Sequence, residues 1–228
     1  MRLVTVSGPP ASGKTSVILH MIPALRDRYG PVGVVKLDCL ATDDDARYRA
    51  AQVPCAVGIS GNLCPDHFFA TNLQDCLEWA AQRRFGLLIV ESAGLCNRCS
   101  PHVQGCGAVC VVDNLLGVNA PRKIGPMLKM ADTVCITKGD VVSQAEREVF
   151  AFHVRKANPG ALILQVNGLT GQGCAELAGA AGAGAACMEE MRLRFNLPAA
   201  VCAYCLGEKR VGKAFQLGNV RRMQFDGP

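Results

Sequence analysis

The stretch "GPPASGKT" at residues 8–15 decides the fold of this chain. It matches the pattern G-x-x-x-x-G-K-[ST] at every fixed position, the pattern of a loop that binds phosphate groups. The apolar run at residues 2–8 predicts a strand before the loop, and residues 14–29 predict a helix after it. This strand–loop–helix context is the one in which the pattern has its meaning, because backbone N–H groups at a helix N-terminus attract phosphate. The stretch therefore predicts a P-loop.

The residue types of the loop predict how it would bind a nucleotide. Its glycines let the backbone wrap the phosphates, and its N–H groups supply positive potential. Lys14 would reach the β- and γ-phosphates, and Thr15 would bind Mg²⁺. The expected nucleotide-binding residues here are Gly8, Pro10, Ala11, Ser12, Gly13, Lys14, Thr15 and Ser16.

The rest of the chain alternates short apolar runs with segments of helical periodicity. Such alternation predicts an α/β fold, a three-layer P-loop NTPase with a mainly parallel sheet flanked by helices. Further strands are expected at 32–38, 52–60, 85–92, 107–114, 133–140 and 161–168. Helices are expected at 66–84, 143–157 and 174–195, and residues 41–50 are expected to form a polar, acidic turn.

The composition changes near Pro198, and this change sets the expected domain boundary. We predict a P-loop GTPase domain at 1–195 and a Cys-containing extension at 196–228. The stretch "GEKRVGKAFQLGNVRRM" of the extension is basic and punctuated by glycine. We interpret it as an arm that docks a partner or covers the nucleotide.

Charge and cysteine content bound the function. A net charge of +5 with scattered Lys and Arg does not favour nucleic acid as a partner. No signal peptide or bilayer-length apolar run is recognisable, so we expect a cytoplasmic protein without membrane contact. Thirteen cysteines in a cytoplasmic chain are not expected to form a disulfide framework. Isolated cysteines should be core residues, whereas the two C-x-x-C pairs at 96/99 and 202/205 indicate metal or redox chemistry.

Two acidic residues end predicted strands. Asp38 and Glu91 should lie at the carboxyl edge of the sheet, where ligands of such folds bind. Bound Mg²⁺ takes one or two carboxylates beside the phosphates. We therefore assign Thr15, Asp38 and Glu91 to Mg²⁺, and Lys14, Asp38 and Glu91 to catalysis.

The stretch "TKGD" at 137–140 predicts the choice of base. A carboxylate at Asp140 can accept both N–H donors on the Watson–Crick edge of guanine, and Lys138 would lay its stem across the base. P-loop GTPases carry Asn where this chain has Thr137. The stretch "VNGLTGQG" at 166–173 looks like the loop that covers the guanine in such enzymes, so Asn167 is also expected to bind nucleotide. GTP is favoured over ATP.

The order of these motifs resembles one family in particular. After the P-loop come "LDCLATDDDA", "GNLCPDH", "ESAG", "PRKIGPM" and "TKGD". In this arrangement residues 1–180 resemble the HypB/UreG family of hydrogenase- and urease-maturation GTPases, nickel-handling members of the SIMIBI class. The resemblance implies a homodimer with metal at its interface and, as further partners, a client metalloenzyme or its maturation factors.

The resemblance also implies where the metal would bind. Members carry a Cys-His or Cys-Pro-His element between strands two and three, which here corresponds to Cys64 and His67 with Asp66 inserted. A further cysteine beyond the Glu-Asn-x-Gly motif corresponds to Cys99, and Cys96 is extra. Thiolate and imidazole ligands suit nickel, zinc, Cu⁺ or an iron–sulfur cluster. Cys96 and Cys99 doubled across a two-fold axis would suffice for zinc or a [4Fe–4S] cluster. Cys202 and Cys205 could form a second site, join the first, or lie in a plain turn.

These observations favour a GTP-hydrolysing metallochaperone that couples nucleotide state to insertion of nickel, another soft metal or an iron–sulfur cluster. Glu91 stands eight residues before Cys99, so nucleotide state can move metal ligands. One alternative is a nucleotide-gated iron–sulfur or redox protein. Another is a P-loop small-molecule kinase, which would have no need of the cysteines.

Overall fold

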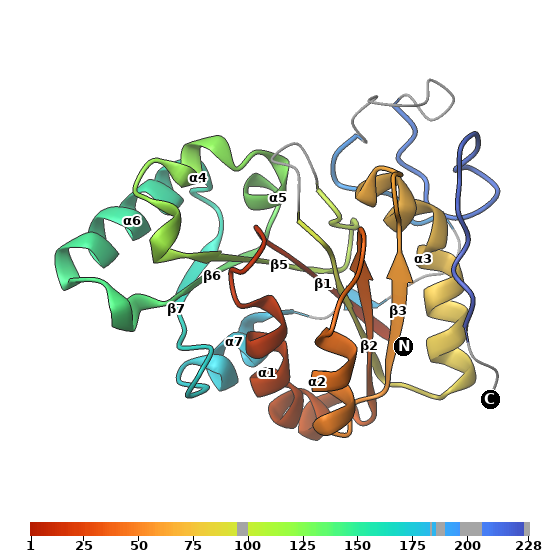
Figure 1. Cartoon of the computed structure of the whole chain (residues 1–228), viewed down its shortest axis with the longest axis horizontal. Coiled ribbons are helices and arrows are strands. Elements are labelled where there is room, and N and C mark those ends of the chain that lie inside the picture. The colour runs from red at the N-terminus through yellow and green to blue at the C-terminus, as the bar shows by residue number, and fades with distance from the viewer. Residues whose placement is uncertain (95–99, 183, 186–189, 197–206, 226–228) are drawn as a thin grey trace.

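The computed structural model describes residues 1–94, 100–182, 184–185, 190–196 and 207–225. Its centre is a sheet in the order β3-β2-β4-β1-β5-β6-β7, in which all seven strands are parallel (Figure 1). These strands are β1 (Arg2–Ser7), β2 (Val32–Asp38), β3 (Cys55–Ile59), β4 (Leu87–Glu91), β5 (Gly107–Asp113), β6 (Thr133–Thr137) and β7 (Leu162–Gln165).

Helices cover both faces of the sheet and give the three predicted layers. One face packs against α1 (Lys14–Tyr29), α2 (Asp44–Ala50) and α7 (Cys174–Ala180). The other face packs against α3 (Pro65–Gln82) at one end and α6 (Gln144–Ala157) at the other, with two four-residue helices, α4 (Ala120–Lys123) and α5 (Pro126–Lys129), beside α6. The three-layer α/β P-loop fold is confirmed.

The strands are nearly continuous apolar runs because both of their faces are buried. In β5, Val109 and Val111 face α1 while Cys110 and Val112 face α6, and all four are inaccessible to solvent. Parallel strands covered on both sides have this composition. The buried cysteines Cys76, Cys106, Cys110 and Cys135 occupy such core positions, as expected, whereas Cys55 on the edge strand β3 is only half-buried.

Two predicted segments differ from the structure. Residues 44–50, expected to lie in a turn, form α2, which buries only Tyr48 and therefore lacks an apolar period. The predicted helix at 174–195 ends at Ala180, and β8 (Gly184–Ala185) pairs antiparallel with Arg2–Leu3 of β1. A Cβ atom on Gly184 would lie 1.6 Å from the carbonyl oxygen of Gly105. This close backbone approach needs glycine, which also weakens a helix.

The described part of the predicted extension, 207–225, runs along α3. The side chain of Asn72 donates to the carbonyl of Arg221 at 2.9 Å and accepts from the N–H of Met223 at 2.8 Å. The ring of Phe225 stacks on Trp79 with 5.8 Å between centroids. This segment thereby extends the core between the sheet and α3.

Candidate functional site

The P-loop lies between the end of β1 and the start of α1, at the carboxyl edge of the sheet. Gly8 and Gly13 adopt positive φ angles of 152° and 92°, which only glycine adopts without strain. A Cβ atom on Gly8 would lie 2.0 Å from the carbonyl oxygen of Val111, so the loop is pressed against β5. The hydroxyl of Ser12 is buried and makes no hydrogen bond within the described part of the chain.

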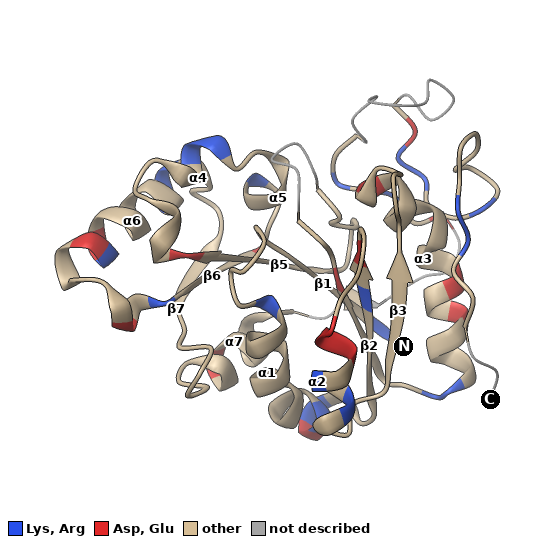
Figure 2. Cartoon of the chain, in the orientation of Figure 1, with Lys and Arg blue, Asp and Glu red and all other residues tan. Residues whose placement is uncertain are grey.

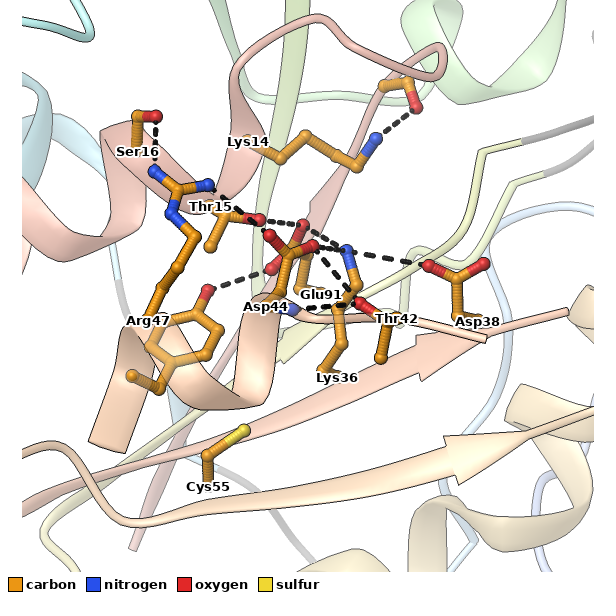
Figure 3. A network of polar contacts seen from close by, with 12 residues as sticks. Lys14, Thr15, Ser16, Lys36, Asp38, Thr42, Asp44, Arg47, Cys55 and Glu91 are labelled. Atoms are coloured by element: carbon orange, nitrogen blue, oxygen red, sulfur yellow. Dashed lines mark hydrogen bonds and ion pairs between the residues drawn. The ribbon is translucent and has the colours of Figure 1, made fainter. Parts of the chain in front are cut away.

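Lys14 is the first residue of α1 and curls back over the loop. Its ammonium group donates to the carbonyl oxygens of Gly8 at 2.9 Å and Pro9 at 3.0 Å (Figure 3). Burial lowers the pKa of Lys14, although nearby Glu91 acts in the opposite direction. Within the described part of the chain the hydrogen-bond partners of this ammonium group are two neutral carbonyls, so it gains strongly from an anion and its position suits phosphate.

Glu91 at the end of β4 organises the other side of the loop. The side chain is inaccessible to solvent, yet both of its oxygens are paired. Oε1 accepts from the Thr15 hydroxyl at 2.9 Å and the Lys36 ammonium at 2.7 Å, and Oε2 accepts from the Tyr48 hydroxyl at 2.7 Å. Lys36 stands directly beside Glu91 because the two residues are register partners of β2 and β4.

Lys36 joins this carboxylate to α2. Its ammonium lies 2.8 Å from Asp44 and 3.8 Å from Asp38, and its side chain is 5% exposed. Asp44 in turn pairs with Arg47 at 3.3 Å, and Arg47 donates to the Ser16 hydroxyl at 2.8 Å (Figure 3). A continuous network of charges thus connects β4, β2, α2 and α1. Figure 2 shows the acidic start of α2 facing the basic start of α1.

The pairing of charges sets the protonation of this network. Burial alone would lower the pKa of Lys36, but Glu91 and Asp44 outweigh it and raise that pKa. Burial would raise the pKa of Asp44, but Lys36 reverses the effect and lowers it. Burial, followed by the charge of Glu91, raises the pKa of the Tyr48 hydroxyl well above its ordinary value. Lys36 and Asp44 are therefore charged at neutral pH, and Tyr48 is a neutral donor.

The "TKGD" residues lie at the other end of the pocket. Thr137 donates its hydroxyl proton to the carbonyl of Ser12 at 2.7 Å, so the residue in the place of the usual asparagine braces the P-loop. Lys138 has a positive φ of 56°, and its ammonium lies 3.2 Å from Asp113. Asp140 is exposed. The side-chain oxygen of Asn167 accepts from the N–H groups of Leu169 at 2.8 Å and Thr170 at 3.0 Å.

Most of these groups border one cavity of about 600 Å³ along the edge of the sheet. Lys14, Lys36, Asp38 and Glu91 line its phosphate end, and Thr137, Lys138, Asp140 and Asn167 line its other end. Most of the residues predicted to bind nucleotide therefore meet in one place. The sequence interpretation missed four members of the site, Lys36, Asp44, Arg47 and Tyr48. The sequence did carry a signal for Lys36. It is a lysine inside an apolar strand, and it lies two residues before the strand-end Asp38, so both side chains point to the same face of the sheet.

The predicted soft-metal ligands are only partly described. Cys64 precedes the first residue of α3, His67 lies in its first turn, and both side chains are half-buried. Burial lowers the pKa of His67, which favours the neutral imidazole. Cys96, Cys99, Cys202 and Cys205 lie outside the described residues. Within the described residues, no three His, Cys, Asp or Glu side chains are arranged to hold a metal ion.

Asp66, the residue inserted in the Cys-Pro-His-like element, contacts the segment that follows the C-x-x-C pair. Its carboxylate is 3% exposed and accepts the backbone N–H of Ser100 at 2.8 Å. Two residues further on, His102 is buried beneath the P-loop strand and contacts Thr5 at 2.9 Å and Ser7 at 3.1 Å. Burial lowers the pKa of His102 to about 4, so this imidazole is neutral. Residues 100–102 are thus anchored both to α3 and to β1.

The fold and the pocket define a nucleotide-binding protein of the α/β P-loop class. The profile of the CobW/HypB/UreG nucleotide-binding domain matches residues 2–165. The chain therefore belongs to the CobW/HypB/UreG family. It is 46% identical over 234 residues to the uncharacterized protein MJ0120 of Methanocaldococcus jannaschii, with complete coverage of both chains.

Solved structures of low sequence identity share the fold. HypB from Helicobacter pylori in complex with nickel is 18% identical with a TM-score of 0.63, covering 78% of this chain and 83% of that one. The hydrogenase maturation factor HypB from Archaeoglobus fulgidus is 20% identical with a TM-score of 0.61, covering 78% and 86%. Among the described residues, no helix has the length and apolar character needed to cross a bilayer.

Proposed function

We propose that this protein is a GTP-hydrolysing metallochaperone. In this proposal it binds nickel, another soft metal or an iron–sulfur cluster and transfers it to a target metalloenzyme, with the nucleotide state controlling release. Family membership and the P-loop pocket support the nucleotide half of the proposal. The connection between Glu91 and the cysteine-bearing segment carries the other half.

The phosphate end of the pocket supports hydrolysis. Lys14 would leave its two carbonyl partners for the β- and γ-phosphates and neutralise the charge that develops during phosphoryl transfer. The Thr15 hydroxyl and the carboxylates of Asp38 and Glu91 are hard oxygen donors beside the loop, a set that fits Mg²⁺. Bound Mg²⁺ would supply charge neutralisation at the phosphates. Asp38, half-buried at the strand end, is our candidate to orient the attacking water.

The base end supports guanine. The carboxylate of Asp140 is exposed at the pocket wall and free of any ion pair with other described residues, so both of its oxygens can accept from guanine N–H groups. The stem of Lys138 borders the same space, with its ammonium drawn toward Asp113. Adenine has no pair of adjacent donors to match this carboxylate. We therefore propose GTP as the nucleotide.

The decisive observation is that Gly94, the residue immediately before the cysteine-bearing segment, lies against the P-loop. Glu91 accepts a hydrogen bond from the Thr15 hydroxyl. Three residues later the backbone turns at Gly94, which has a φ of 66°. A Cβ atom on Gly94 would lie 1.7 Å from the carbonyl oxygen of Gly8. Phosphate binding that shifts the loop must therefore shift residue 94, the residue immediately before 95–99. Nucleotide state and the position of Cys96 and Cys99 would be linked in this way.

The far end of the same segment is tied to the other expected ligands. Because Asp66 holds the N–H of Ser100, residue 100 stays beside the start of α3, which carries Cys64 and His67. Residue 94 thus lies against the P-loop, and residue 100 lies against the Cys64–His67 turn. This double attachment supports one soft-metal site made by Cys64, His67, Cys96 and Cys99. We propose that two protomers share it in a homodimer, and that Cys202 and Cys205 supply further thiolates.

Metal affinity measured in two nucleotide states tests the proposal. Anaerobically purified protein would be titrated with nickel and zinc in the presence of GDP or a non-hydrolysable GTP analogue. We expect the two affinities to differ by roughly 5- to 150-fold, the usual range of coupling between sites. Cys64→Ser and Cys99→Ser should lose metal, whereas Cys55→Ser, which alters a half-buried thiol on β3, should keep it.

Other outcomes would favour the alternatives. Equal metal affinity in both nucleotide states would mean that the cysteines form a structural metal site that does not respond to the nucleotide. Visible absorbance with acid-labile sulfide in every nucleotide state, and nucleotide-dependent reduction, would favour a redox protein. Transfer of the terminal phosphate to an acceptor other than water would favour a kinase.

A further inference from the structure

Lys36 is a buried charged group of the pocket that has no role in the proposed reaction. Its ammonium is buried at the phosphate end, within 2.7 Å of Glu91, 2.8 Å of Asp44 and 3.8 Å of Asp38. The oxygen of Glu91 that it contacts is also the one that accepts from Thr15. Lys36 therefore lies among the same oxygens that form the candidate Mg²⁺ shell.

Mg²⁺ and the Lys36 ammonium cannot bind the same carboxylate oxygens at the same time. Mg²⁺ binds oxygen at about 2.0–2.1 Å in near-octahedral geometry. The ammonium already lies 2.7 Å from Glu91 Oε1, and two cations on one carboxylate oxygen repel each other strongly in a buried site. Tyr48 holds the second oxygen of Glu91 at 2.7 Å, so the carboxylate has no room to turn its other side to the metal.

We propose that Lys36 is a built-in competitor of Mg²⁺, which occupies the carboxylates of the nucleotide-free protein and yields them only when Mg²⁺ arrives with nucleotide. This inference concerns regulation of the site proposed above and rests on its assignment as a nucleotide–Mg²⁺ site. The nucleotide supplies phosphate oxygens to the ion, and free Mg²⁺ has none of them. The pocket would thus reject the free ion and accept the complex.

Displacement of Lys36 would also weaken the contacts that hold α2. Asp44 opens this helix and is held by Lys36 at 2.8 Å, by Arg47 at 3.3 Å and by Thr42 at 3.3 Å. Because Lys36 is the buried partner of the three, its departure removes the strongest support of Asp44. The Arg47–Ser16 bond at 2.8 Å and the hydrogen bond between Asp44 and Thr15 would then remain as links from α2 to α1. Filling of the pocket should therefore loosen residues 44–50.

The test uses Mn²⁺, which prefers the same oxygen ligands as Mg²⁺ and is detected by electron paramagnetic resonance. Mn²⁺ is titrated into full-length, nucleotide-free protein. We expect Lys36→Met to bind one Mn²⁺ per chain about tenfold or more tightly than the wild type, because a unit positive charge about 4 Å from the ion has been removed. Lys138→Met is the matched control, since it removes a lysine from the same cavity but leaves the carboxylates near α2 untouched.

Two further variants secure the interpretation. The double variant Lys36→Met/Glu91→Gln should lose the gained Mn²⁺, which would locate the ion at Glu91. If Lys36→Met does not fold, as judged by circular dichroism, Lys36→Gln takes its place. In the wild type, a non-hydrolysable GTP analogue should raise Mn²⁺ affinity at least about tenfold and speed amide hydrogen exchange in residues 44–50.

Several results would overturn the proposal. The first is a folded Lys36 variant whose Mn²⁺ affinity lies within about twofold of the wild type. The second is an equal gain of Mn²⁺ affinity in Lys138→Met. The third is unchanged amide hydrogen exchange in residues 44–50 when the wild type binds the nucleotide complex. The titration without nucleotide contains no GTP and no soft metal. It therefore gives its answer even if GTP hydrolysis or metal transfer proves absent.

Discussion

The two ends of the nucleotide pocket are built on opposite principles. At the phosphate end Glu91 is inaccessible to solvent and has three donors on its two oxygens, supplied by Thr15, Lys36 and Tyr48. At the base end Asp140 is exposed and makes no ion pair with another described residue. The phosphate end is held by internal partners without any ligand, whereas the other end presents a carboxylate without an ion-pair partner among the described residues.

This difference determines how strongly a substitution at each end of the pocket should affect the stability of the fold. Replacing a buried carboxylate that has several donors is strongly destabilising, because it leaves a buried charge without its partner. An exposed carboxylate without an ion pair can be changed at small cost to the fold. Substitutions at the two ends should therefore have separable effects.

The largest effect should come from Lys14→Ala, which removes the cation of the phosphate end. We expect GTP hydrolysis to fall by about 10²–10³-fold or more, because the terminal phosphate charge loses a preorganised partner. The measurement is phosphate release at saturating GTP and Mg²⁺. Lys156→Ala, on the exposed face of α6, serves as the control and should hydrolyse GTP like wild type. Full activity of Lys14→Ala would remove the P-loop from catalysis.

Glu91→Gln should show that the phosphate end belongs to the fold. The amide keeps the shape of the side chain but leaves Lys36 without its closest carboxylate, which should lower the free energy of unfolding by about 3 kcal/mol. Urea denaturation measures this loss. Asp140→Asn should change the same quantity by less than about 0.5 kcal/mol. Equal losses in the two variants would contradict the contrast between the two ends.

Asp140→Asn should reveal the role of the base end in selectivity. We expect GTP affinity to fall about ten- to a hundredfold, since a charged acceptor is lost, while affinity for xanthosine triphosphate should rise. The reason is that the new amide can donate to the 2-position carbonyl of xanthine. Fluorescent-nucleotide competition gives both affinities, with Glu148→Gln on α6 as the control. Equal affinity of the unmutated protein for ATP and GTP would remove Asp140 from base recognition.

The smallest effect concerns pH and the support beneath the phosphate end. His102 contacts Ser7 below the P-loop, and its pKa in the fold is about 4, below the ordinary value near 6.5. The unfolded chain therefore binds the proton first as pH falls, and stability is lost between about pH 6.5 and pH 4. We expect a loss of about 2 kcal/mol from His102 at pH 5 relative to pH 7.5.

Denaturation at both pH values in wild type and His102→Gln tests this expectation. The variant should be less stable at pH 7.5 but should lose less on acidification. The same pH slope in both proteins would show that other groups cause the acid sensitivity.

Much of the fold could be predicted because its signals are local. The P-loop fixes the join of β1 and α1, and continuous apolar runs mark the buried parallel strands. Helix α2 was missed because Tyr48 is its sole buried side chain, so no period could be read from it. The helix predicted at 174–195 was too long because alanine favours helix, whereas the approach of Gly184 to Gly105 is a tertiary contact that leaves no local trace.

The site was predictable to the same extent. Asp38 and Glu91 could be found because a strand-end acid is visible in the sequence. Lys36 was missed because its meaning depends on partners that the fold brings from Glu91 and Asp44. The function of Asp66 was hidden for the same reason, since it binds a backbone N–H group 34 residues away. Long-range pairing of charges is what the sequence does not display.

The position of β1 has a consequence for how the chain folds during its synthesis. Strand β1 comes before the other strands in sequence, yet it lies inside the sheet between β4 and β5, and its first residues pair with β8 at Gly184–Ala185. The chain must be synthesised at least as far as Ala185 before β1 has all its neighbours. Such distant pairings slow folding, because chain closure comes before the contacts that reward it. The nascent chain therefore carries an apolar, half-paired strand until β8 has been made, and truncations before residue 184 should yield aggregates instead of smaller folded units.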